Sequence, residues 1–102
     1  MQDITVQELK ERMDNKEELY IVDVREPWEY QEFNIGAKLV PSGQLQHAVS
    51  ELSDWRDKEL ILHCKSGGRS GAAKNFLLAQ GFTKVRNLLG GMMAWQAMGN
   101  SQ

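Results

Sequence analysis

The chain has 102 residues, 41% of them hydrophobic, and this length suits a single domain spanning residues 1–102 with one core. Its net charge is −2, and the basic residues are scattered except around residue 64, which argues against a nucleic-acid partner. It contains no run of about 18 apolar residues and does not begin like a signal peptide, so we expect a soluble, cytoplasmic protein that does not bind a membrane.

The first half of the chain predicts a helix, a strand and a second helix. Thr5 and Glu8 have the spacing of a capping pair for a helix that runs to about Asp14. The continuous apolar run 19–22 predicts a strand buried on both faces, and Pro27 begins a short helix.

The rest of the chain continues the alternation of strands and helices. In order, we predict a strand at 38–40, a helix at 42–52, a strand at 60–63, a helix at 70–80, a strand at 85–87 and a helix from 90 to about 98. Gly81 and Gly99 follow the last two helices, as glycine commonly does at helix C-termini. The alternation predicts an α/β fold, a mostly parallel central sheet with helices on both faces.

Cys64 is the only cysteine, and it lies between a predicted buried strand and the 70–80 helix. The loop that follows it contains Lys65, Ser66, Gly67, Gly68, Arg69 and Ser70. Backbone N–H groups of such a loop and the helix dipole favour an anion, and the two cations favour a thiolate. We therefore expect a nucleophile whose pKa lies below the ordinary value. The alternative, a small core residue, leaves the glycines and cations unexplained.

The spacing within this loop separates two classes of cysteine enzyme. The tyrosine-phosphatase pattern has five residues between its cysteine and its arginine, whereas residues 65–68 alone separate Cys64 from Arg69. One residue adds roughly 3.3 to 3.6 Å of chain, so the shorter loop encloses less space. A single sulfur atom suits that space better than a phosphate does.

Three stretches of the chain together resemble the rhodanese (sulfurtransferase) family. The pattern Cys-x-x-Gly-x-Arg-Ser of its active loop is matched by Cys64, Gly67, Arg69 and Ser70. Residues 20–30 resemble its strand-Asp-x-Arg-x-x-x-Glu-aromatic signature, and residues 87–95 its Leu-x-Gly-Gly-x-x-x-Trp signature. Residues 33–41 depart from the family pattern, because the usual histidine is missing, so we expect that loop to differ in shape.

The resemblance implies a double displacement through a persulfide on Cys64. A thiolate takes sulfur from a small-molecule donor such as thiosulfate, and cyanide or a cellular thiol then removes it. We expect the N–H groups from Lys65 to Ser70 to bind the charged outer sulfur, and both Gly67 and Gly68 to be needed for this. Arg69 is expected to brace the loop. Ser70 is expected to cap the helix and to donate a hydrogen bond to the sulfur.

The side chains of Lys65 and Ser66 have two interpretations. Both lie at the mouth of the predicted loop, where they either help to admit an anionic donor or are simply solvated. No cofactor is implied, and one cysteine with two histidines gives no metal-site spacing.

Two groups of polar residues near the strand ends have structural and chemical interpretations. Asp23 and Arg25 lie where open α/β sheets bind ligands, but the resemblance implies that they brace loops, with Glu29 as the partner of Arg25. His63 is expected to be a buried histidine with satisfied hydrogen bonds rather than a base or a metal ligand. Gly90 and Gly91 are expected to permit a tight turn or a positive φ.

Three functions remain open from the sequence. The first is a sulfurtransferase. The second is a noncatalytic sulfur carrier or regulatory interaction module that serves a partner protein in sulfur trafficking. The third is a phosphatase or arsenate reductase, whose longer loop is absent.

Overall fold

The computed structural model describes residues 2–100, whose strands form one parallel sheet with the order β2-β1-β3-β4. The elements in chain order are α1 (Val6–Asp14), β1 (Tyr20–Asp23), α2 (Pro27–Glu32), β2 (Lys38–Leu39), η1 (Ser42–Gln44), α3 (Leu45–Ala48), η2 (Ser53–Trp55), β3 (Glu59–His63), α4 (Gly68–Ala79), β4 (Lys84–Asn87) and α5 (Gly91–Asn100). The predicted parallel α/β sheet is confirmed. No helix in this described part of the chain is long and apolar enough to cross a membrane.

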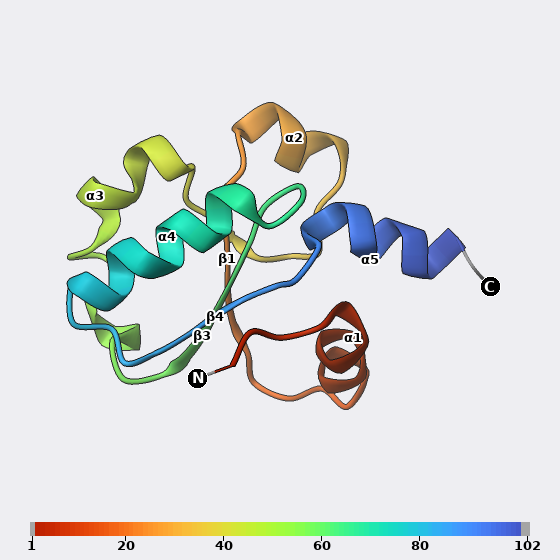
Figure 1. The fold of residues 1–102 in the computed structure, drawn as a ribbon, viewed down its shortest axis with the longest axis horizontal. Helices are drawn as coiled ribbons and strands as arrows, with labels where there is room; N and C mark the ends of the chain where they lie inside the picture. The colour runs from red at the N-terminus through yellow and green to blue at the C-terminus, as the bar shows by residue number, and fades with distance from the viewer. Residues whose placement is uncertain (1, 101–102) are drawn as a thin grey trace.

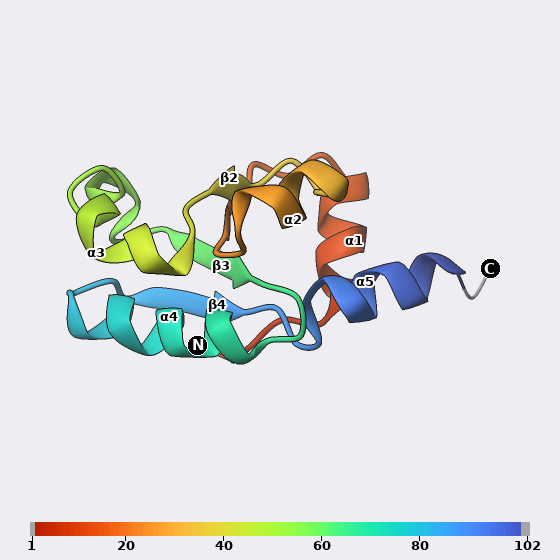
Figure 2. The ribbon, with the colours of Figure 1, turned by 90° about the horizontal axis from the view of Figure 1, so that it is seen from above.

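Helices cover both faces of the sheet, as predicted. Leu60 and Leu62 of β3 pack into a core with side chains of α3 and α4, while Ile61 packs into a second core with side chains of α1 and α5. Figures 1 and 2 accordingly show α3 and α4 on one side of the strands and α1 and α5 on the other. Each fully buried aliphatic side chain of this kind contributes roughly 1.5 to 3 kcal/mol through removal from water.

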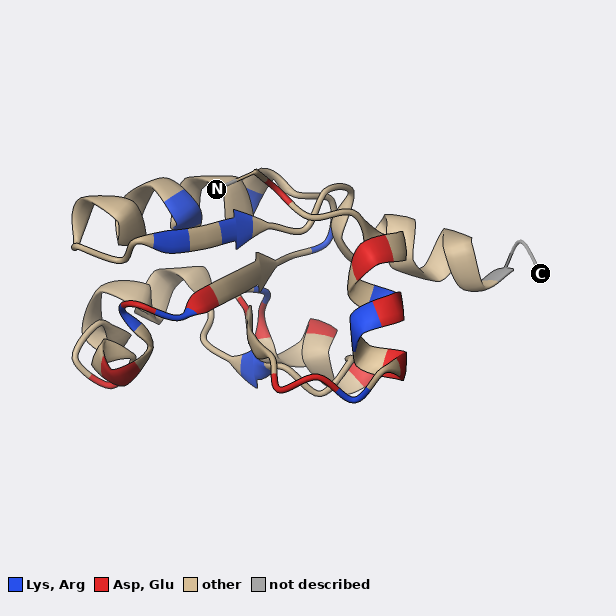
Figure 3. Cartoon of the chain, turned by 90° about the horizontal axis from the view of Figure 1, so that it is seen from below, with Lys and Arg blue, Asp and Glu red and all other residues tan. Residues whose placement is uncertain are grey.

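Charged side chains attach α1 to the strands β3 and β4. Glu59 on β3 accepts hydrogen bonds from Arg12 on α1 at 2.6 and 2.9 Å and from Arg86 on β4 at 2.7 Å. The bonds from Arg12 lower the pKa of Glu59 to about 2. Acidic and basic residues lie side by side along α1 (Figure 3), so much of its charge is used in pairs within the fold.

Three predicted helix boundaries are wrong. The 42–52 segment is η1 followed by the single turn α3, in keeping with the low helix propensity of Gly43. α4 begins at Gly68 rather than Ser70, because Gly67 already turns the chain with a φ of 107°. α5 continues through Gly99 to Asn100.

The parallel topology brings the functional segments to one edge of the sheet. β1, β3 and β4 all end at this edge, so the loops that follow Asp23, His63 and Asn87 meet there. Figure 1 shows the loop after β3 lying between α2 and the start of α5. This arrangement places Cys64 at the common edge.

Candidate active site

The site is centred on the Cys64 loop, which we define as residues 64–70. The Cys64 residue is 1% exposed, and its Sγ accepts hydrogen bonds from the backbone N–H of Gly67 at 3.1 Å and of Ser70 at 3.4 Å. The Oγ of Ser70 lies 3.3 Å from the same sulfur. The sulfur is therefore nearly closed off from solvent, but donors of the loop point at it.

These donors change the acidity of the thiol. Burial raises the pKa of Cys64, whereas hydrogen bonds from the Ser70 side chain and from the amides of Ser70, Gly67 and Ser66 lower it. The hydrogen bonds outweigh burial, so the pKa lies below its ordinary value. The thiolate, which is the nucleophilic form, is accordingly favoured.

The two glycines of the loop, Gly67 and Gly68, differ in backbone conformation and in the space around them. Gly67 has a φ of 107°, a conformation that side-chain-bearing residues rarely adopt. Gly68 has no such φ, and a Cβ there would meet no atom within 4 Å. Gly67 is also the residue that precedes α4, so the prediction that Ser70 caps this helix is wrong.

The loop is held from behind by the N-terminus of α5. The N–H of Met92 donates to the carbonyl of Cys64 at 2.9 Å, and the N–H of Met93 donates to the carbonyl of Lys65 at 2.9 Å. Gly91 permits this approach, because a Cβ there would lie 2.4 Å from the Cys64 oxygen. Its φ is 54°, and that of Gly90 is 76°, which confirms the predicted positive φ of both glycines. With these carbonyls held at α5, the amides of the loop are turned toward the sulfur.

Arg69 braces the loop against α2. Its Nη1 and Nη2 donate to the two carboxylate oxygens of Glu29 at 2.7 and 2.9 Å. These bonds lower the pKa of Glu29 to about 2. The predicted Glu29–Arg25 pair is wrong, because Arg25 instead donates to Asp23 and to the carbonyl of Phe33, both at distances down to 2.7 Å. Asp23 and Arg25 thus form a buried pair that holds the loop after β1.

Asn87 is a residue of the site that the sequence does not single out. This residue is 8% exposed at the end of β4, and its amide contacts the Oγ of Ser70 at 2.5 Å and the carbonyl of Gly67 at 3.1 Å. It stands at the start of the third family signature and at the carboxyl end of a strand, which are the two signals that point to it. Asn87 joins β4 to the Cys64 loop through side-chain contacts.

His63 is buried beside the site, but its predicted hydrogen bonds are absent. Neither ring nitrogen has a hydrogen-bond partner among the described residues, and Nε2 lies 3.9 Å from the Asp23 carboxylate. Burial lowers the pKa of His63 to about 4 from an ordinary value of 6.5. The imidazole is therefore neutral at physiological pH.

This buried histidine predicts a loss of stability in acid. Between about pH 6.5 and pH 4 the unfolded chain protonates His63 and the folded chain does not, so the unfolding free energy falls as pH falls. At 1.36 kcal/mol per pKa unit, the loss is on the order of 3 kcal/mol. Urea unfolding at several pH values is expected to show this slope in the wild type and a smaller one in His63→Leu. Identical pH profiles would contradict the assignment.

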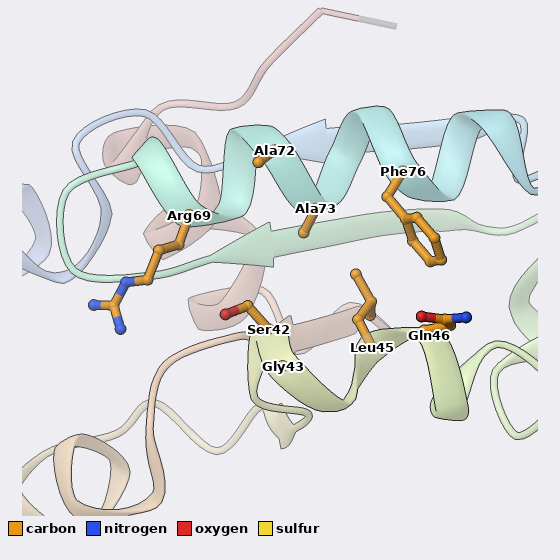
Figure 4. A pocket seen from close by; sticks show the side chains of 8 residues that line it. All are labelled: Ser42, Gly43, Leu45, Gln46, Arg69, Ala72, Ala73 and Phe76. Atoms are coloured by element: carbon orange, nitrogen blue, oxygen red, sulfur yellow. The ribbon is translucent and has the colours of Figure 1, made fainter.

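Two hollows flank the Cys64 loop. Figure 4 shows the first, of about 280 Å³, between α4 and the segment 42–46. The second, of about 230 Å³, is lined in part by Trp28, Lys65 and Met93. Arg69 lines the first and Glu29 the second, so their ion pair stands between the hollows. Trp28 and Met93 are 62% and 55% exposed, which is unusual for large apolar side chains.

The geometry makes the Cys64 loop a candidate site for a nucleophile. No group of three or more histidine, cysteine or acidic side chains within residues 2–100 is arranged to hold a metal ion. The side chains of Lys65 and Ser66 are exposed at the outside of the loop. The chemistry available is thus that of a thiolate surrounded by N–H donors.

Comparison with known proteins agrees with this class of site. The family described as rhodanese-like domain matches residues 5–98, and the chain belongs to this family. A solved structure, the rhodanese-like domain protein from Staphylococcus aureus, has a TM-score of 0.84 at 31% identity, covering 93% of this chain and 91% of that one.

Three relatives are informative about the reaction. A sulfurtransferase of Allochromatium vinosum is 33% identical over 98 residues, which are 95% of this chain and 90% of the relative. The putative sulfurtransferase YtwF of Bacillus subtilis is 38% identical over 97 residues, covering 94% and 91%. The putative sulfur carrier protein YrkF of the same species is 36% identical over 94 residues, 91% of this chain but only 50% of YrkF. By their names, these three relatives are a sulfurtransferase, a putative sulfurtransferase and a putative sulfur carrier.

Proposed function

We propose that this protein is a sulfurtransferase that holds sulfane sulfur as a persulfide on Cys64. The observation that carries the proposal is the convergence of the Gly67 and Ser70 amides on Sγ, at 3.1 and 3.4 Å. Such fixed donors stabilise negative charge on sulfur without reorganising during the reaction. The sulfurtransferase relatives, which match nearly the whole chain, support the same reaction class.

The reaction runs in two displacements. The Cys64 thiolate attacks the outer sulfur of thiosulfate, a sulfur–sulfur bond forms to Cys64, and sulfite leaves with the electron pair of the broken bond. The negative charge then lies on the outer sulfur of the persulfide, within reach of the loop amides. A second nucleophile, cyanide in an assay or a cellular thiol, takes this outer sulfur and restores the thiolate.

The neighbouring hollow supplies an approach for donor and acceptor. Lys65 lines it and directly follows Cys64, so its ammonium group attracts an anionic donor to the mouth of the loop. Trp28 and Met93 form an apolar rim on the same hollow. Of the two interpretations of Lys65, we therefore favour donor attraction. We also propose that the reaction takes place in the cytoplasm, where a reducing environment keeps an unpaired thiol free.

A sulfur carrier is the second candidate, and one observation favours it. The relative YrkF, 36% identical over 94 residues, is a putative sulfur carrier. A carrier accepts sulfur once and keeps it until a partner protein removes it. The same persulfide on Cys64 serves both functions.

The rate of the second displacement distinguishes the two candidates. We expect the protein to produce thiocyanate from thiosulfate and cyanide through many turnovers, with the parallel double-reciprocal lines of a double displacement. Cys64→Ser, which keeps the size of the side chain but not its nucleophile, is the control and is expected to be inactive. Stoichiometric loading followed by release over minutes would instead establish the carrier. Phosphate release from an aryl phosphate would contradict both.

A further inference from the structure

The hydroxyl group of Ser70 lies close to three acceptors. Its Oγ is 2.5 Å from the Oδ1 of Asn87, 3.3 Å from the Sγ of Cys64 and 3.4 Å from the carbonyl oxygen of Gly67. The Gly67 carbonyl already accepts the N–H of Gly71 and the side-chain amide of Asn87. A hydroxyl group has one hydrogen and donates it to one acceptor at a time. The other two acceptors, Asn87 and Cys64, therefore compete for the same hydrogen.

The orientation of the Asn87 amide is fixed by its surroundings. Its Nδ2 donates to the carbonyl of Gly67 at 3.1 Å, and because a carbonyl only accepts, the Oδ1 has to face Ser70. The backbone N–H of Asn87 donates to the Asp3 carboxylate at 2.9 Å, which Lys74 also contacts at 2.6 Å. Asn87 thus presents a fixed acceptor to the Ser70 hydroxyl.

We propose that Asn87 is a positioning residue that competes with the Cys64 sulfur for the hydroxyl hydrogen of Ser70. When Cys64 is a thiol, its S–H donates to the Oγ of Ser70, and the hydroxyl donates to Asn87. When the thiol proton leaves for solvent, the hydroxyl has to turn from Asn87 to the thiolate. The presence of Asn87 therefore disfavours the thiolate.

Formation of the persulfide returns the Ser70 hydroxyl from the sulfur to Asn87. This step rests on the proposed function. Once the outer sulfur is bound, the Sγ of Cys64 is neutral and the charge lies on the outer atom. The Ser70 hydroxyl then returns to Asn87. Asn87 consequently stabilises the loaded protein relative to the free thiolate, which favours sulfur loading over its reversal.

Other charged groups around the sulfur are not altered by this exchange. Arg69 on α4 is neutralised by Glu29 on α2, His63 on β3 is uncharged above about pH 4, and the charge of Lys65 is at the exposed side of the loop. Behind Asn87, Asp3 and Lys74 form an ion pair at 2.6 Å. A change in the acidity of Cys64 on substitution of Asn87 therefore reports the hydrogen that Ser70 donates.

The test is a double-mutant cycle on the acidity of the thiol. The pKa of Cys64 is measured from the pH dependence of its alkylation by iodoacetamide. We expect Asn87→Ala to lower this pKa by about one unit, the size of one hydrogen bond to a charged acceptor. In the Ser70→Ala background the same substitution is expected to leave the pKa unchanged, because no hydroxyl remains to be released.

Two results would overturn the proposal. An equal pKa shift from Asn87→Ala with and without Ser70 would show that Asn87 acts through the Gly67 carbonyl alone. An unchanged or raised pKa of Cys64 when Asn87→Ala is made in the protein that retains Ser70 would exclude the competition. If Asn87→Ala does not fold, Ser70→Ala in the otherwise wild-type protein decides. We expect the pKa of Cys64 to rise in Ser70→Ala, because the thiolate loses a donor, but by less than about one unit, because Asn87 no longer opposes the thiolate. A rise of about one unit or more would show that the sulfur already holds the hydrogen. Alkylation needs no sulfur donor, so a failure of persulfide formation is seen separately.

Discussion

Gly91→Ala is expected to lower sulfur transfer on the order of 100-fold, the loss that a displacement of about 1 Å at reacting groups causes. A Cβ at this position would lie 2.4 Å from the Cys64 oxygen and 2.7 Å from the Lys65 oxygen, both of which are backbone atoms. The loop and the start of α5 therefore have to separate. This separation breaks the hydrogen bonds from Met92 and Met93 that turn the loop amides toward the sulfur.

Gly99→Ala is the matched control for this prediction. Gly99 also lies in α5, but a Cβ there would meet no atom within 4 Å, and its φ is ordinary. Steady-state turnover with thiosulfate and cyanide is the measurement, with circular dichroism to verify that both variants fold. A folded Gly91→Ala protein with wild-type turnover would show that the contact between α5 and the Cys64 loop does not position the amides.

Gly67→Ala is expected to reduce transfer by a similar factor, on the order of 100-fold, through loss of one fixed donor to the sulfur. A Cβ would have space at Gly67, since its nearest neighbour would be 3.7 Å away, but the φ of 107° is strained for alanine. Relief of this strain rotates the N–H that now lies 3.1 Å from Sγ. The effect is therefore one of backbone conformation rather than of crowding.

The adjacent glycine gives an internal comparison. Gly68→Ala introduces the same side chain one residue later, at the first position of α4, where there is open space and an ordinary φ. It is expected to keep wild-type turnover and to be slightly more stable, by about 0.5 kcal/mol, because the unfolded chain is less flexible. Equal losses from the two alanine variants would mean that the amide orientation at Gly67 is not what matters.

The sequence is sufficient to predict the sheet and to place the candidate nucleophile, Cys64, in the loop after a buried strand. Continuous apolar strands such as 60–63 and the glycine-rich segment after Cys64 are local signals, and parallel strands bring their carboxyl ends to one edge. The positive φ of Gly90 and Gly91 was predicted in the same way. The close approach of Gly91 to the carbonyl oxygen of Cys64 is not a local feature, because it joins two distant parts of the chain, and the sequence does not predict it.

The sequence does not predict which polar side chains pair with each other. Glu29 lies 40 residues from Arg69 but only four from Arg25, and local spacing favoured the nearer arginine. Which arginine pairs with Glu29 depends on the side on which α2 packs against the Cys64 loop. Asn87 and Ser70 likewise meet across 17 residues. The ring nitrogens of His63 have no hydrogen-bond partner among the described residues, which depends on its surroundings in three dimensions.

The mass of the intact protein after exposure to thiosulfate tests the central claim most directly. Loading of one sulfur adds about 32 Da, and this addition is expected in the wild type, to be removed by cyanide or a reducing thiol. Fragmentation is expected to place it on Cys64, and Cys64→Ser is expected to gain nothing. An unchanged mass for the wild-type protein, with the thiol still reactive toward iodoacetamide, would contradict a persulfide held by the Cys64 loop.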